Sequence, residues 1–81
     1  MNLHEVNIAV AKLVDSWCER RALSCLRHLL PAWPHNGLTD GVAELKTALE
    51  NVRAFGRDEL ADDEEISLSR TIAALDAALA R

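Results

Sequence analysis

The chain is poor in residues that interrupt helices and in residues that cross-link small proteins. Its 81 residues include two prolines, three glycines, two cysteines, two tryptophans, one phenylalanine and no tyrosine. Two cysteines are too few for the disulfide framework that stabilises many proteins of this size. We therefore expect one small domain over residues 1–81 that is stabilised by side-chain packing and helped by self-association.

Long apolar runs and an excess of positive charge are also missing. No stretch approaches the ~20 apolar residues of a membrane-spanning helix, and the N-terminal segment lacks the basic region of a signal peptide. Thirteen acidic residues outnumber nine basic ones, which gives a net charge of −4. We expect a cytoplasmic protein that binds neither membranes nor, directly, nucleic acids, because phosphates repel acidic surfaces. We also expect no cofactor, because the sequence contains no phosphate-binding or dinucleotide-binding motif.

Apolar residues recur at intervals of three and four through most of the chain, which predicts helices. We expect helices near residues 3–19, 22–30, 41–57 and 63–80, packed as a small all-α antiparallel bundle of three to four helices. Asn2 with Glu5, and Asp62 with Glu65, have the spacing of capping boxes at helix N-termini.

The first two helices are separated by no glycine or proline. The apolar positions of residues 3–17 and those from Ala22 onward nevertheless point in roughly opposite directions on one continuous helix. Two explanations stay open. The chain turns near residues 19–21, which we favour, or one long helix packs against different neighbours along its length.

The segment LPAWPHNGLTDG, residues 30–41, contains both prolines and two of the three glycines. Its prolines end one helix, Asn36 and Gly37 suit a turn, and Thr39 or Asp40 is placed to cap the next helix. We interpret the segment as a connector in which Trp33 folds back over the end of the core. The alternative is an exposed partner-binding surface that includes Trp33 and His35.

Cys18, Cys25 and His28 are the only side chains whose spacing suggests thiol or metal chemistry. On one helix the two cysteines would lie two turns, about 10.5 Å, apart, which is too far for a disulfide. The spacing C-x₆-C-x₂-H also differs from that of zinc sites. Cys25 and His28 lack the third group and the cleft of a catalytic pair. We expect buried thiols and no metal, and a thiol or metal site is the least favoured function.

The sequence DELADDEE, residues 58–65, carries most of the negative charge. Acidic residues around the first turn of a helix are stabilised by the positive end of its dipole, and the segment lacks the ligand alternation of a calcium loop. The functional alternative is an exposed patch that binds a basic partner. Its residues would be Asp58, Glu59, Asp62, Asp63, Glu64 and Glu65.

These observations favour a small non-enzymatic protein–protein interaction module, an adaptor or regulatory subunit that acts through helical faces. The alternative is an acidic binder of the inhibitor, antitoxin or immunity-protein type that blocks a larger protein or nucleoprotein machine. We also expect a homodimer. Its candidate interface is a second apolar face of the last helix, formed by Ile66, Ala73, Ala77 and Ala80. The partner protein and the biological process are not specified by the sequence.

Overall fold

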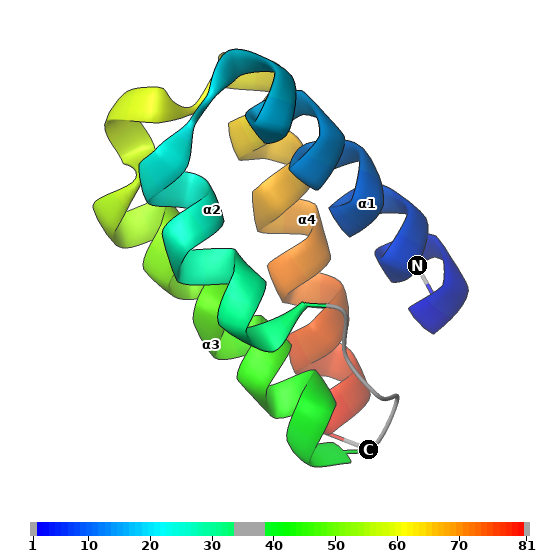
Figure 1. Cartoon of the computed structure of the whole chain (residues 1–81). Coiled ribbons are helices and arrows are strands. Elements are labelled where there is room, and N and C mark those ends of the chain that lie inside the picture. The colour runs from blue at the N-terminus through cyan, green and yellow to red at the C-terminus, as the bar shows by residue number, and fades with distance from the viewer. Residues whose placement is uncertain (1, 34–38, 81) are drawn as a thin grey trace.

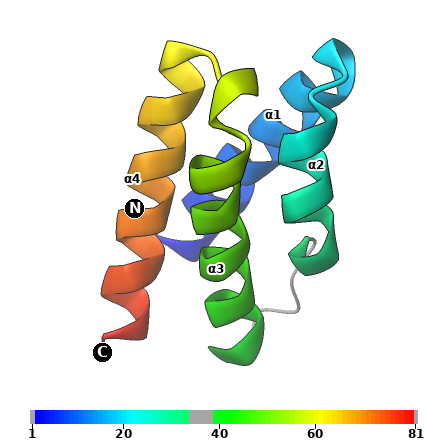
Figure 2. The ribbon, with the colours of Figure 1, turned by 90° about the vertical axis from the view of Figure 1, so that its left-hand side faces the viewer.

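The computed structural model describes residues 2–33 and 39–80, and every regular element among these residues is helical. In chain order these are α1 (Leu3–Arg20), α2 (Leu23–Leu29), the 3₁₀ turn η1 (Leu30–Ala32), α3 (Thr39–Phe55), the 3₁₀ turn η2 (Arg57–Glu59) and α4 (Asp62–Leu79). Each helix packs against the next one in the chain, and α4 also packs against α1 (Figures 1 and 2). The prediction of a small all-α bundle is confirmed. None of the described helices is long and apolar enough to cross a membrane.

α1 begins and ends through local hydrogen bonds. The Asn2 side chain accepts from the Glu5 amide at 2.8 Å, and the Asn2 amide donates to the Glu5 carboxylate at 3.4 Å, so the predicted capping box is present. At the other end Arg21 takes the left-handed conformation (φ 55°, ψ 44°). The Ala22 amide then donates to the Trp17 carbonyl at 2.8 Å. This left-handed residue ends the helix without a glycine, so residues 3–30 form two helices and the favoured turn is confirmed.

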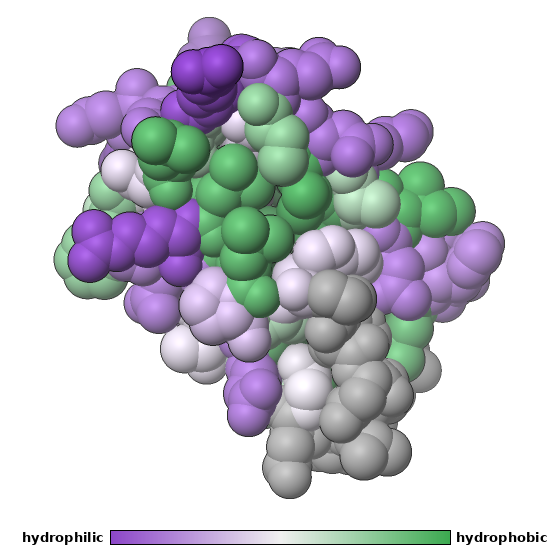
Figure 3. Space-filling view, viewed as in Figure 1, coloured by the Kyte–Doolittle hydropathy of each residue, from purple (hydrophilic) through white to green (hydrophobic). Residues whose placement is uncertain are grey.

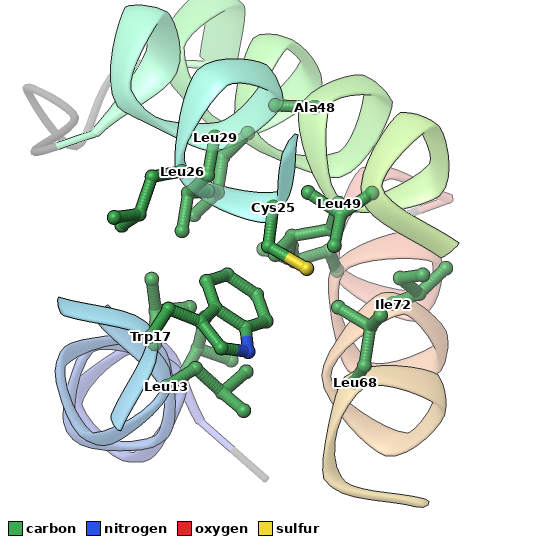
Figure 4. Close-up of a cluster of buried hydrophobic side chains, with 14 of the residues drawn as sticks. Leu13, Trp17, Cys25, Leu26, Leu29, Ala48, Leu49, Leu68 and Ile72 are labelled. Carbon is green, nitrogen blue, oxygen red and sulfur yellow. The ribbon is translucent and has the colours of Figure 1, made fainter. Parts of the chain in front are cut away.

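The core lies where the four helices face one another, and Trp17 is its largest fully buried side chain (Figure 4). Its indole Nε1 has no hydrogen-bond partner among the described residues. The buried apolar residues are Val6, Val10, Leu13 and Trp17 of α1; Ala22, Cys25, Leu26 and Leu29 in and before α2; Val42, Leu45, Ala48, Leu49 and Val52 of α3; and Leu68, Ile72 and Leu75 of α4.

Several residues that the periodicity assigned to apolar faces are exposed instead. Phe55 is 70% exposed because it is the last residue of α3, where the ring of His28 contacts it at a centroid distance of 5.6 Å. Leu23 and Leu30, at the ends of the short α2 segment, are 66% and 49% exposed, and Leu3 in the first turn of α1 is also exposed. Helix ends extend beyond the neighbours that bury helix centres, which periodicity alone does not indicate.

The boundaries of α3 and α4 differ from the predicted ones by one to two residues. α3 begins at Thr39, so Thr39 and Asp40 belong to its first turn and do not precede it, and α3 ends at Phe55. In α4 the N-cap is Ala61, whose amide donates to the Glu64 carboxylate at 3.0 Å, so the predicted pairing of Asp62 with Glu65 is wrong by one position. Trp33 is half-buried and packs against the core, as the connector interpretation predicted. His35 lies outside the described residues.

Candidate interaction surfaces

Glu64, one of the predicted partner-binding acids, is turned into the protein. It is 6% exposed, and its carboxylate accepts hydrogen bonds from Ser16 Oγ at 2.6 Å, from the Arg20 guanidinium and from the Ala61 amide. Burial raises the pKa of Glu64, but the hydrogen bonds from Ala61, Ser16 and Arg20, together with the Arg20 charge, outweigh it and lower that pKa below its ordinary value. Glu64 therefore joins α4 to α1 and is not available to a partner.

Glu59 also bonds within the chain. Its carboxylate accepts from the backbone amides of Ser24 at 2.9 Å and Cys25 at 3.2 Å. These amides belong to the first turn of α2, whose own N-cap residue, Ala22, offers no side-chain hydrogen bond. Glu59 thus caps the start of α2, although it lies 35 residues after Ser24 in the sequence. Arg20 donates to the Glu59 carbonyl oxygen at 3.0 Å. Arg20, Glu59 and Glu64 together form what we call the α1–α4 clasp.

The acidic segment is therefore not one exposed patch, and the expectation for two of its residues is corrected. Glu64 is buried and Glu59 caps α2, while Glu65 lies 3.5 Å from Arg57. The acids that remain exposed, without a hydrogen bond or ion pair among the described residues, are Asp58, Asp62 and Asp63. The sequence pattern indicates only that these acids are favourable near the positive end of a helix dipole. It does not reveal the clasp, because the residues that bond to one another in the clasp are far apart in the sequence.

The two thiols lie in different environments on different helices. Cys18 of α1 is exposed and Cys25 of α2 is buried, and both are free, so the prediction of buried thiols is confirmed for Cys25 and wrong for Cys18. Burial, followed by the charge of Glu59, raises the pKa of the Cys25 thiol to about 11, and Cys25 Sγ donates to the Gly56 carbonyl at 3.5 Å. A raised pKa disfavours the thiolate that nucleophilic chemistry and metal binding require. Within residues 2–33 and 39–80, no group of three or more His, Cys, Asp or Glu side chains is arranged to hold a metal ion.

Among the residues that the structure describes, grooves lie along two of the helix pairs. The larger of these two, of about 540 Å³, runs along the surface where α2 packs on α3, and we call it the α2–α3 groove. The smaller, of about 340 Å³, lies between α1 and α4 and includes Lys12, Asp63 and the buried Glu64. The larger groove is lined by Arg27, His28, Pro31, Ala32, Ala43, Glu44, Thr47, Ala48 and Asn51.

The α2–α3 groove exists because its α3 wall is built from small side chains. Ala43, Thr47 and Ala48 leave space that larger residues would fill. Phe55 lies one helical turn beyond Asn51 on the same helix, so it stands at one end of the groove, next to His28. Glu44 is exposed toward the other end, roughly 16 Å from Phe55 along the helix axis.

The predicted face of α4 is exposed. Ile66 is 58% exposed, and Ala73, Ala77 and Ala80 are exposed as well. Alanines on an exposed helix face also occur without a partner, because alanine has the highest helix propensity. The exposed alanines of α4 are therefore weaker support for a protein interface than the large exposed side chains around α2 are.

Comparisons of this chain with models of known protein families, with curated proteins and with solved structures found no match. The function is therefore inferred from the surfaces of the chain itself.

Proposed function

We propose that this protein is a non-enzymatic protein-interaction module that binds an apolar helical segment of a partner protein in the α2–α3 groove. The observation that supports this proposal is the position of Phe55. This large aromatic side chain is 70% exposed at the end of a groove whose α3 side is lined by small residues. Aromatic side chains that project beside a pocket are typical anchors of protein interfaces. Folding of the chain alone leaves this surface uncovered.

The size and chemistry of the groove define the partner segment. The roughly 16 Å from Glu44 to Phe55 correspond to about three turns of a helix. Such a helix would insert large apolar side chains over Ala43, Thr47 and Ala48 and would cover Phe55. Glu44 has no ion pair among the described residues, so a basic residue at that end of the partner segment would pair with it. The net charge of −4 favours approach of a basic partner.

The experiment compares a variant that fills the groove with one that removes the aromatic anchor. Neither substitution is at a core position. Thr47→Trp fills the groove and Phe55→Ser removes the aromatic ring; both positions are exposed on α3. Ala77→Trp, on the exposed face of α4, is the matched control. Each tagged variant is incubated with extract of the native cell, and bound proteins are identified by mass spectrometry after chemical cross-linking.

We expect one partner that binds the wild type and Ala77→Trp but neither groove variant. Circular dichroism must show the same helix content for all three variants. A partner that binds Thr47→Trp and Phe55→Ser as well as the wild type would exclude the groove.

The acidic-binder alternative now rests on three residues. Asp58, Asp62 and Asp63 remain exposed beside the clasp. Replacing all three with asparagine should leave groove binding intact, because these side chains lie near the start of α4 and outside the groove. Loss of the partner in this triple variant, together with its retention by Thr47→Trp, would favour the acidic binder.

A further inference from the structure

A second apolar surface lies on the opposite side of α2 from the groove. His28 marks the side of α2 that faces α3, because its ring contacts Phe55. Leu26 and Leu30 are each two residues from His28 and therefore about 200° around the helix from it. They point to the side of α1, and Leu23 follows the same direction one turn earlier. Leu23 and Leu30 are 66% and 49% exposed.

α1 contributes a matching flank. Ser16 marks the side of α1 that faces α4, since its hydroxyl donates to Glu64. Cys18 is two residues from Ser16 and so about 200° around the helix from it. Ala11 and Val14 lie seven and four residues before Cys18, on the same side. Ala11 and Cys18 are exposed, and Val14 is half-buried against the core.

Four exposed residues, the half-buried Val14 and the buried Leu26 beneath them form one surface, which we call the α1–α2 face. The exposed residues are Ala11, Cys18, Leu23 and Leu30. Figure 3 views the molecule from this side and shows hydrophobic side chains gathered at its centre, with hydrophilic side chains around them. The face contains no charged residue. A partner that covers it must therefore be apolar in the centre.

The edges of the α1–α2 face carry opposite charges. On α1, Asp15 is four residues after Ala11 and three before Cys18; on α2, Arg27 is four residues after Leu23 and three before Leu30. Both side chains are exposed, and neither has an ion pair among the described residues. Asp15 lies six residues before the turn at Arg21 and Arg27 six residues after it. Because α1 and α2 run in opposite directions from this turn (Figure 1), the two residues lie at similar heights along the face.

We infer that the α1–α2 face binds a second copy of this chain in a two-fold symmetric dimer. A rotation of 180° about an axis that runs along the seam between α1 and α2 places α2 of one copy over α1 of the other. Leu23 and Leu30 of each copy then cover Val14 and Cys18 of its partner. The same rotation places Arg27 of each copy over Asp15 of the other, twice. The surface is thus complementary to itself in both hydrophobicity and charge, as a two-fold interface requires.

This interface differs from the face of α4 that the sequence favoured. The α4 face offers mainly alanines, which bury little area, whereas the α1–α2 face offers two exposed leucines and paired charges. Arg27 lies between the two surfaces and also lines the α2–α3 groove, whereas Leu23 and Leu30 do not line it. The inference is therefore separated from the proposed function by the leucine variants. A variant that cannot dimerise should still bind a partner segment in the groove.

The test is the molar mass in solution, measured by light scattering after size exclusion at about 10 and 100 µM, a range that a modest interface spans. The wild type should approach twice the 8.9 kDa of one chain at the higher concentration. Leu23→Glu, with or without Leu30→Glu, should give the mass of one chain with unchanged circular dichroism. Ile66→Glu is the matched control, a similarly exposed side chain on α4, and should dimerise like the wild type.

A charge exchange tests the arrangement of the two copies. Arg27→Asp and Asp15→Arg should each weaken the dimer at least tenfold, and the double variant should recover most of the loss because the pair is restored with reversed sign. A wild type of one-chain mass at 100 µM would overturn the inference. Monomerisation by Ile66→Glu but not by Leu23→Glu would overturn it in favour of the α4 face.

Discussion

Arg20, the last residue of α1, binds Glu64 in the first turn of α4, 44 residues later in the chain. The same guanidinium donates to the carbonyl oxygen of Glu59, whose carboxylate caps α2. One arginine therefore holds together the ends of three helices. Because these contacts lie where the chain turns between helices, they fix the relative positions of α1, α2 and α4.

Replacing Glu64 with alanine should lower the free energy of unfolding by about 2 kcal/mol. The change removes hydrogen bonds to a buried charged group and leaves Ser16 Oγ and the Ala61 amide without their acceptor. Urea titration followed by circular dichroism measures the loss. Asp63→Ala, at the adjacent exposed acid, should change stability by less than about 0.5 kcal/mol. Equal effects at both positions would contradict the role of the clasp.

Stability should fall in acid because of Glu64. Its pKa is lowered in the folded protein, so the unfolded chain binds the proton more readily. The stabilisation is fully present above the ordinary carboxyl pKa, near 4.5. The stabilisation is lost as the pH falls from this value through the lower pKa that Glu64 has in the folded protein.

Urea titrations at a series of pH values from 7 to 3 compare the wild type with Glu64→Gln. The stability difference between them should be constant at the higher pH values and should shrink below about pH 4.5. A difference that does not change over this acidic range would show that Glu64 ionisation does not stabilise the fold.

Glu59→Ala should destabilise the start of α2. The amides of Ser24 and Cys25 lose their acceptor, which for a helix N-cap costs about 1 kcal/mol. Hydrogen exchange measured by NMR should become faster at these two amides first. Glu59→Gln should retain part of the protection because its amide oxygen also accepts hydrogen bonds, and Asp58→Ala should have no effect on them.

Gly56→Ala should destabilise the protein by about 1–3 kcal/mol, because a Cβ atom there meets neighbours that cannot move freely. The added carbon would lie 3.0 Å from Cys25 Sγ and 3.0 Å from the Val52 carbonyl oxygen. The φ of Gly56, −103°, is one that any residue can adopt, so the backbone conformation does not require glycine here. Glycine is required because α2 approaches closely at this position. Cys25→Ala removes the first contact, so the double variant should lose less stability than the two single losses added together.

The two cysteines should differ in reactivity toward a thiol-specific reagent. Cys18 is exposed, whereas Cys25 is buried with a pKa near 11. At neutral pH, and at a protein concentration low enough for the monomer to predominate, one thiol per chain should react quickly, and the second should react only as the protein unfolds. Cys18→Ser should abolish the fast phase. Two fast thiols in the native wild type would contradict the burial of Cys25.

The sequence by itself determined the helices and most of the core. The spacing of Val6, Val10, Leu13 and Trp17 fixes the buried side of α1, because a helix repeats every 3.6 residues whatever its neighbours are. The capping of α1 by Asn2 was predictable because donor and acceptor are three residues apart. Interactions within one or two turns depend on local geometry, which the sequence alone specifies.

Only the tertiary structure decided which polar and apolar side chains are available at the surface. Glu59 and Glu64 resemble the exposed acids beside them, yet their partners, Ser24 and Ser16, lie 35 and 48 residues away. Phe55 continues the apolar spacing of α3 but is exposed because α3 ends there. Burial depends on which helices meet and where they end, and the packing of distant segments sets both.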